Sequence, residues 1–269
     1  ELNLVLSQHE DNATAHYYLA SAYAGLKKTN DALAEIKRIS SADEYFVESR
    51  VLGAFMLQQD KRYPEAIDLI NDALTAKKEE VKLLGLRATM EHESGNDEAA
   101  VETTLQLIKL SPTEDKYQFT LGVYLDELGK KDEALKAMHR AIELDPKNAN
   151  ALNYLGYSLA ERGEKLDEAE ALIKRALDVE KGNGYYLDSL GWLYHQQGKY
   201  REAGAELEKA VAAVPTDSVI LEHYAIILIK LNNKKKALEV IQKALLHVGE
   251  SDDKGVGERL KSLLEKLEK

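Results

Sequence analysis

Small residues recur along this chain at a nearly constant interval, and apolar residues recur with them. One ladder of alanines has intervals of 34 residues, with a single interval of 35: Ala32, Ala66, Ala100, Ala134, Ala169, Ala203 and Ala237. A second ladder of small residues lies 12 or 13 positions upstream: Ala20, Ala54, Ala88, Gly122, Gly156, Gly191 and Ala225. This period indicates an array of seven two-helix units rather than one compact domain.

Each unit contains two apolar stripes with helical spacing. We number the units so that the upstream small residue is position 8 and the following alanine is position 20. In the fifth unit the apolar residues of the two stripes are Leu152, Leu155, Leu159, Ala169, Ile173 and Ala176. Intervals of three and four place each set on one face of a helix. Glycines such as Gly198 predict the turn between the helices, and Pro215 marks the end of a second helix.

The sixth unit carries the fullest version of the repeated motif. It reads Leu187-x-x-Leu190-Gly191-x-x-Tyr194, then Gly198-x-Tyr200-x-x-Ala203, followed by Leu207, Ala210 and Pro215. This motif resembles the tetratricopeptide repeat, and seven copies agree in register over residues 13–251. The resemblance implies an all-α fold, namely a right-handed α-α superhelix of seven helix-turn-helix repeats plus a C-terminal capping helix.

The two ends differ from the seven units. Residues 1–12 fit the end of a second helix of a preceding repeat, because Leu2 and Val5 take positions 24 and 27. We therefore expect further repeats upstream. Residues 252–269 predict a linker and a one-sided capping helix, with apolar residues at Leu260, Leu263, Leu264 and Leu267. A helix that covers the last repeat and shows charge to water suits the natural end of an array, which we expect near residue 269.

Two units depart from the pattern. In the third unit, Arg87 and Glu91 take positions that are usually apolar, and they stand four residues apart, as helical ion pairs do. One interpretation is a degenerate repeat with a solvated ion pair. The other is a local change of superhelical pitch or a docked partner. The fifth unit has one extra residue in its turn, between Gly163 and Ala169, which we expect the loop to absorb.

Composition narrows the function. The chain has 47 acidic and 36 basic residues and a net charge of -11, which argues against duplex DNA or an anionic membrane surface as the main partner. It contains no cysteine and no run of 18 apolar residues, so we expect no disulfide and no membrane insertion by these residues. Its seven histidines lack the spacing of a helical metal pair, and it has no glycine-rich phosphate loop. We expect no catalytic residues, metal or cofactor, and no nucleic-acid partner.

A second stripe on each first helix, at positions 2, 5, 9 and 12, is the candidate binding surface. In the tetratricopeptide family this stripe lines the concave face and meets the ligand. The candidate groove residues are Tyr17, Phe55, Phe119, Asn153, Tyr157, Tyr185, Asp188, Trp192, His195, Glu222 and Ile226. Large aromatic residues there suit partner binding, although they would also serve to fill space between neighbouring first helices. Asp188 and Glu222 would repel a carboxylate, so we expect an apolar extended or helical segment, or a folded protein, as the ligand.

These features favour a non-catalytic protein-binding scaffold or adaptor. The stretch from Asn150 to Tyr157, the long turn before Ala169 and the stretch from Leu187 to Trp192 are similar to bacterial cell-envelope repeat lipoproteins. That resemblance implies a periplasmic or outer-membrane protein, lipid-anchored through an upstream cysteine, rather than a cytoplasmic one. Such proteins include adaptors of a carboxyl-terminal processing protease and factors for polysaccharide export or pilus assembly. Two alternatives remain: the substrate-selecting repeat region of a larger enzyme, and a self-assembling scaffold.

The small-residue ladders generate a first prediction. We expect positions 8 and 20 to face each other within a unit and position 27 to face the next unit, so that a large side chain there forces the helices apart. Ala203→Leu should therefore lower the free energy of unfolding by about 1–3 kcal/mol, measured by urea denaturation. Substitution of the neighbouring Glu202 by alanine is the control and should change it little. Equal effects of the two substitutions would show that the ladders do not mark helix contacts.

Overall fold

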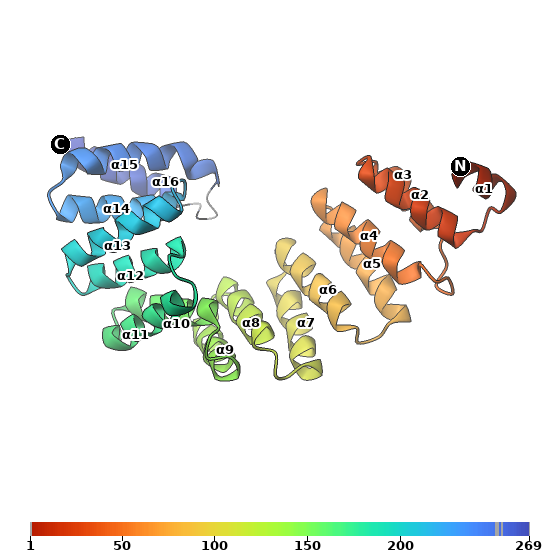
Figure 1. Ribbon diagram of the computed structural model, residues 1–269, viewed down its shortest axis with the longest axis horizontal. Helices are drawn as coiled ribbons and strands as arrows, with labels where there is room; N and C mark the ends of the chain where they lie inside the picture. The colour runs from red at the N-terminus through yellow and green to blue at the C-terminus, as the bar shows by residue number, and fades with distance from the viewer. Residues whose placement is uncertain (1, 251–252, 254, 269) are drawn as a thin grey trace. The chain divides into compact units, whose positions relative to one another are not determined.

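The computed structural model describes residues 2–250, 253 and 255–268, and every regular element among them is helical (Figure 1). This confirms the predicted all-α class. The chain divides into two compact units, residues 1–137 and 138–269, and the boundary falls within α9 (Lys131–Leu144).

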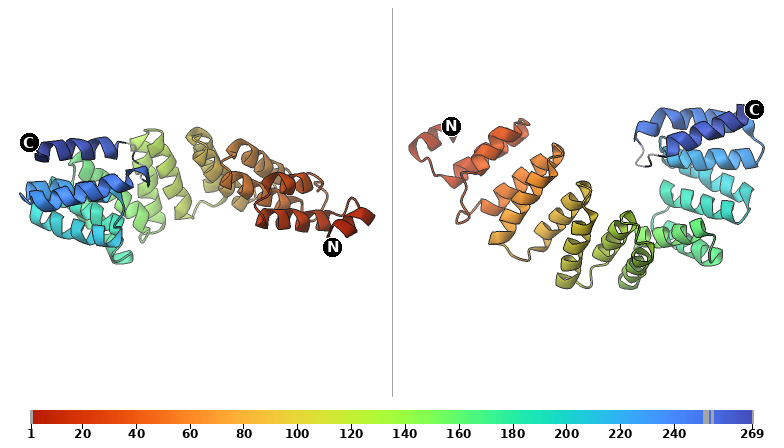
Figure 2. Two further views of the ribbon diagram at one scale, coloured as in Figure 1. Left: turned by 90° about the horizontal axis from the view of Figure 1, so that it is seen from above. Right: turned by 180° about the vertical axis from the view of Figure 1, so that it is seen from behind.

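The amino-terminal unit is built from helices that lie side by side in chain order (Figures 1 and 2). Its elements are α1 (Leu2–Gln8), α2 (Ala13–Gly25), α3 (Thr29–Ile36), α4 (Phe46–Gln59), α5 (Tyr63–Ala76), α6 (Val81–Glu93), α7 (Asp97–Leu110) and α8 (Asp115–Glu127). Helices α2, α4, α6 and α8 are the first helices of the predicted repeats. Helices α3, α5 and α7 are second helices, so the helix-turn-helix order is as the sequence predicts.

The carboxyl-terminal unit continues the same alternation. Its elements are α10 (Ala149–Arg162), α11 (Leu166–Val179), α12 (Gly184–Gln196), α13 (Tyr200–Ala213), α14 (Ser218–Lys230), α15 (Lys234–His247), a short 3-10 helix (Val248–Glu250) and α16 (Val256–Glu268). Helix α16 is the predicted capping helix. It lies against both helices of the seventh repeat, α14 and α15.

The two ladders of small residues form the contacts between paired helices. All fourteen residues are buried. A Cβ atom added at Gly156 would lie 3.0 Å from the carbonyl oxygen of Ala169, and one added at Gly191 would lie 2.6 Å from Leu207. Position 8 therefore faces the second helix of its own repeat, as expected. At position 27, Ala210 shares a buried cluster with Ile220 of the next repeat.

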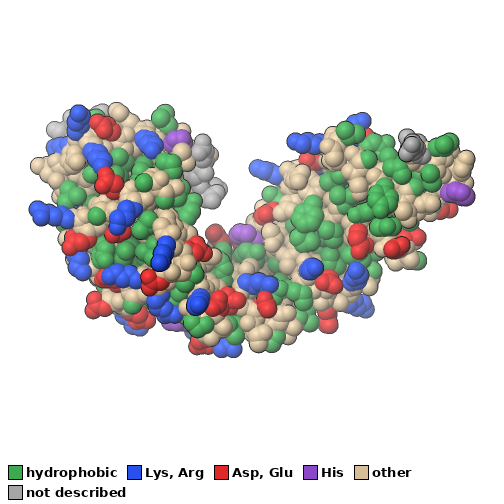
Figure 3. Space-filling model, viewed as in Figure 1, with side chains coloured by type: hydrophobic (Ala, Val, Ile, Leu, Met, Phe, Trp, Pro, Cys, Tyr) green, Lys and Arg blue, Asp and Glu red, His purple; other side chains and the backbone are tan. Residues whose placement is uncertain are grey.

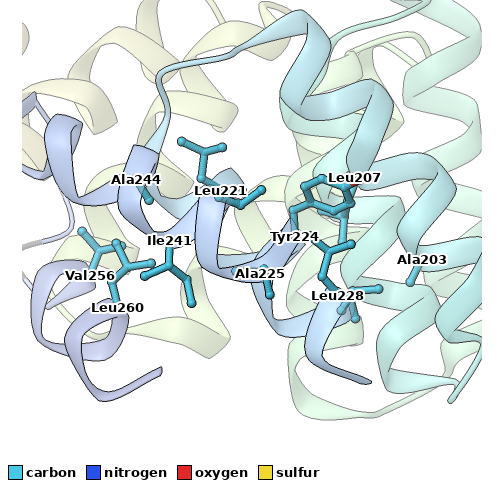
Figure 4. Close-up of a cluster of buried hydrophobic side chains, with 13 residues drawn as sticks. Ala203, Leu207, Leu221, Tyr224, Ala225, Leu228, Ile241, Ala244, Val256 and Leu260 are labelled. Carbon is cyan, nitrogen blue, oxygen red and sulfur yellow. The ribbon is translucent and has the colours of Figure 1, made fainter. Parts of the chain in front are cut away.

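The largest described core in the carboxyl-terminal unit joins the last two repeats to the capping helix (Figure 4). Ala203 and Leu207 come from α13, Ala225 from α14, and Val256 and Leu260 from α16. Val256 and Leu260 are fully buried, and each such burial stabilises by about 1.5–3 kcal/mol. Most of the polar side chains of α16 face water, as a cap requires.

The turn between the two helices has the same backbone conformation in all seven repeats. Position 15 has positive φ in each: Lys27, Lys61, Gly95, Gly129, Gly163, Gly198 and Asn232. A left-handed residue ends the first helix and reverses the chain. In the fifth repeat a second residue, Lys165, also has positive φ, 45°. The loop thus absorbs the extra residue while α10 and α11 keep their lengths, as the sequence analysis expected.

The third repeat corrects one interpretation. Arg87 Nε lies 3.3 Å from Glu91 Oε1, so the ion pair forms, but Glu91 is buried rather than solvated. The hydroxyl of Thr103 on α7 accepts a hydrogen bond from Arg87 at 3.2 Å and donates one to Glu91 at 2.7 Å. Burial raises the pKa of Glu91. The repeat replaces apolar contacts by a hydrogen-bonded network, because its second helix supplies a hydroxyl where the charges meet.

The first repeat has an unusually short second helix. Helix α3 has 8 residues, whereas α5 and α7 each have 14. The buried Arg50 of α4 donates hydrogen bonds to the backbone oxygens of Ile36 at 2.8 Å and Ile39 at 3.1 Å. These bonds satisfy carbonyl groups at and beyond the end of the helix. The following loop leads to Tyr45, directly before α4.

The shared turn conformation generates a prediction. A non-glycine residue in the left-handed region costs about 1 kcal/mol or more, whereas glycine adopts it freely. Lys61→Gly should therefore raise the free energy of unfolding by about 0.5–1 kcal/mol, and Gly129→Ala should lower it by about 1 kcal/mol. Urea denaturation followed by circular dichroism measures both. If both substitutions shifted stability in the same direction, backbone conformation at position 15 would not be the cause.

Candidate functional site

The first-helix stripe of the amino-terminal unit borders an open hollow of about 570 Å³. Its lining comes from α2, α4, α6 and the loop before α6: Tyr17, Val47, Glu48, Val51, Leu52, Phe55, Lys77, Glu80, Lys82, Leu83 and Leu86. We call this the amino-terminal hollow. Two lysines and two glutamates are the charged members, and the other lining residues are apolar or aromatic. Figure 3 shows hydrophobic side chains gathered over α2 and α4 on this unit.

Phe55 is the most prominent predicted residue in the hollow. It lies on α4, at position 9 of the second repeat, and 42% of its surface is exposed. An exposed phenylalanine within an apolar hollow gains contact area when a partner covers it. The other predicted phenylalanine, Phe119 on α8, is half-buried and does not line the hollow.

Three tyrosines extend the aromatic surface beside the hollow. The ring of Tyr17 stacks on Tyr45 with centroids 4.6 Å apart, and Tyr18 meets Tyr17 edge-on at 5.6 Å. Tyr18 is 51% exposed. Tyr18 and Tyr45 are not among the groove residues predicted from the sequence. Tyr45 lies in a loop outside the helical period, and its approach to Tyr17 depends on the early end of α3.

The stripe of the carboxyl-terminal unit contains a buried ion pair. His223 Nδ1 lies 2.9 Å and 3.0 Å from the two carboxylate oxygens of Asp188. Both side chains are buried. The ring of Trp192 stacks on His223 at a centroid distance of 4.2 Å, and the ring of His195 lies 4.8 Å from Trp192. The first helix of the sixth repeat is thus joined to the first helix of the seventh by charge at Asp188 and by stacking at Trp192.

A second ion pair joins the stripe to the capping helix. Arg259 of α16 donates to both carboxylate oxygens of Glu222, at 2.8 Å from Nε and 2.6 Å from Nη2. It also donates to Asp253 at 2.7 Å. These contacts correct the expectation that Asp188 and Glu222 present uncompensated charge to a ligand. Helical spacing within one repeat cannot predict that a neighbouring helix supplies the cation. For this reason His223 and Arg259 were not predicted from the sequence as partners of Asp188 and Glu222.

The remaining predicted residues of this stripe vary in exposure. Tyr185 is exposed, whereas Asn153, Tyr157, Trp192, His195 and Ile226 are half-buried. Burial raises the pKa of Tyr157 and lowers that of His195. The Oδ1 atom of Asn153 and the Nδ1 atom of His195 are buried and have no hydrogen-bond partner among the described residues. Trp192 thus keeps part of its ring accessible while its face is fixed by His223.

Within the described ranges, no three His, Asp or Glu side chains are grouped to hold a metal ion. Among the helices that the structure describes, none has the length and apolarity needed to cross a membrane. The two stripes offer aromatic and aliphatic contact surface, and in the carboxyl-terminal stripe Asp188 and Glu222 are paired with His223 and Arg259.

Comparison with known proteins agrees with the observed architecture. Two segments, residues 119–186 and 194–253, match models of the tetratricopeptide repeat family. No curated protein matches the chain significantly. These two segments are similar to tetratricopeptide repeats in sequence.

Solved structures share this fold at low sequence identity. A tetratricopeptide repeat protein from Parabacteroides merdae is 17% identical, with a TM-score of 0.71 over 96% of this chain and 99% of that protein. PilW, described as a widely conserved type IV pilus biogenesis factor, is 19% identical, with a TM-score of 0.65 over 82% of this chain and 100% of PilW. YrrB, described as having an unusual peptide-binding site, is 20% identical, with a TM-score of 0.53 over 69% and 95%. At these identities the likeness establishes the fold.

The pKa of His223 generates a prediction. Burial acts to lower this pKa, but the charge and hydrogen bond of Asp188, together with the charge of Glu222, raise it above the ordinary value of 6.5. A group whose pKa is raised on folding stabilises fully below its unfolded pKa and loses that contribution as pH rises through the folded pKa. The Asp188–His223 pair should therefore stabilise the unit below about pH 6.5 and do so less at higher pH.

We expect His223→Gln to lower the free energy of unfolding more near pH 6 than near pH 9. Urea unfolding followed by the fluorescence of Trp192, the single tryptophan of the chain, measures the difference between the two proteins. A difference that is constant, or that grows toward pH 9, would contradict a stabilising imidazolium.

Proposed function

We propose that this chain is a non-catalytic scaffold that holds a partner protein on its first-helix stripe, with the amino-terminal hollow as the principal contact. The observation that supports this most directly is the exposure of Phe55 inside a mainly apolar hollow. Soluble proteins seldom leave such a surface open unless it meets a partner. The peptide-binding site ascribed to YrrB, which has the same fold, is consistent with this use.

The hollow favours an uncharged, apolar ligand segment. Its charged residues, Glu48, Lys77, Glu80 and Lys82, balance in number, so they give no net attraction to an acidic or a basic tail. Clamping a terminal carboxylate would need a cluster of cationic and amide side chains, whereas the two lysines of the hollow are accompanied by two glutamates. The partner is therefore an extended or helical segment that inserts apolar side chains beside Phe55.

A finer hypothesis places the protein in the bacterial cell envelope, as a lipid-anchored adaptor. Its support is the resemblance of residues 150–157 and 187–192 to envelope repeat proteins, together with the shared fold of PilW, which is described as a pilus biogenesis factor. Under this hypothesis the partner is a processing protease or another component of the envelope machinery.

Peptide selection tests the proposed contact. The wild-type chain serves as bait for a displayed peptide library, and the affinity of an enriched peptide is then measured by fluorescence anisotropy. Phe55→Ala should weaken binding by about 30-fold, corresponding to about 2 kcal/mol, as expected for a buried aromatic anchor. Leu105→Ala is the matched control. Leu105 is 43% exposed, nearly the same as Phe55, but it lies on the second helix α7.

The comparison of Phe55 with Leu105 decides between a specific contact and general hydrophobicity. Equal losses of affinity for the two variants, or the absence of enriched peptides, would reject the amino-terminal hollow as the binding site. Light scattering over a range of concentrations tests the self-assembly alternative in the same preparations.

A further inference from the structure

The capping helix makes a polar contact that capping does not require. Val256 and Leu260 already attach α16 to the core of the seventh repeat. Arg259, which lies between them in sequence, instead reaches the first-helix stripe and pairs with Glu222. Glu222 occupies position 5 of α14, and the side chain of Arg259 is 47% exposed while that of Glu222 is 4% exposed. The arginine thus covers a stripe position from the solvent side.

The residues around this contact form the carboxyl-terminal part of the candidate stripe. Trp192 stacks on His223, the residue that follows Glu222. The charges of Arg259 and Asp253 also act on Tyr157, whose pKa is raised chiefly by burial. Arg259 acts to lower that pKa and Asp253 acts to raise it. At Glu222, the stripe of the carboxyl-terminal unit is thus covered by the chain's own Arg259.

The chemistry of the contact is selective for a guanidinium group. A buried carboxylate is costly unless a cation pairs with it, and a planar guanidinium satisfies both carboxylate oxygens at once. The second acidic stripe residue, Asp188, already has His223 as its partner. Glu222 is therefore the position in this stripe whose charge depends on α16.

We propose that Glu222 is an arginine-recognition position in the carboxyl-terminal stripe, that Arg259 fills it as an internal ligand, and that a partner segment bearing arginine beside apolar residues competes for it. The support is charge complementarity, since the occupant seated there is an arginine flanked by Val256 and Leu260. This inference rests on the proposed function, because it takes the stripe as a ligand-binding face. It concerns a different set of residues from the amino-terminal hollow.

The experiment uses the full chain and a synthetic peptide with the sequence of residues 253–264. Trp192, the single tryptophan, reports binding through its fluorescence. Because the tethered Arg259 acts at a high effective concentration, Arg259→Ala should bind the peptide on the order of tenfold more tightly than the wild-type chain. Lys261→Ala is the matched control, since Lys261 is an exposed cation on the same helix. A peptide with alanine in place of its arginine should bind Arg259→Ala no more tightly than it binds the wild-type chain.

Equal affinity of the wild-type, Arg259→Ala and Lys261→Ala chains for the peptide would overturn the proposal. So would binding that does not depend on the arginine of the peptide, or no binding by folded Arg259→Ala. If Arg259→Ala does not fold, Arg259→Lys keeps the positive charge without the paired hydrogen bonds, and it should show an intermediate gain. The readout is independent of Phe55, so this proposal and the proposed function can fail separately.

Discussion

Close contact between paired helices is the constraint on which the rest of this structure depends. Positions 8 and 20 are occupied by glycine or alanine in every repeat, and at Gly156 there is no room for a further carbon beside the backbone of Ala169. Each pair of helices buries its apolar faces only against itself and its neighbours. A second stripe on each first helix lies beside these contacts, and the proposed binding surfaces are built from that stripe.

The two units use this stripe in different ways. In the amino-terminal unit it is mainly apolar, and it borders a hollow that contains the exposed Phe55. In the carboxyl-terminal unit it carries Asp188 and Glu222, and both are paired within the protein. The same repeat geometry thus provides an open hydrophobic surface in one unit and a charged surface covered by its own arginine in the other.

Buried polar networks occur where the repeat pattern is broken. In the third repeat, Arg87 and Glu91 replace apolar residues. The hydroxyl of Thr103 hydrogen-bonds to both of these charged side chains. The first repeat shortens α3, and Arg50 bonds the carbonyl groups there. In both cases a group that would be costly to bury is paired locally, so the departure is accommodated without loss of the helix contacts.

The sequence by itself determined the helix order, the turns and the buried ladders, because a period of 34 residues and the 3.6-residue helical period are local properties of the chain. It also placed Phe55 and Trp192 on the stripe. Tertiary structure alone decided that Tyr45 stacks on Tyr17, that His223 neutralises Asp188, and that Arg259 reaches Glu222 across 37 positions. These contacts join different elements, and which charges meet across them depends on how the helices pack, which helical spacing within one repeat does not encode.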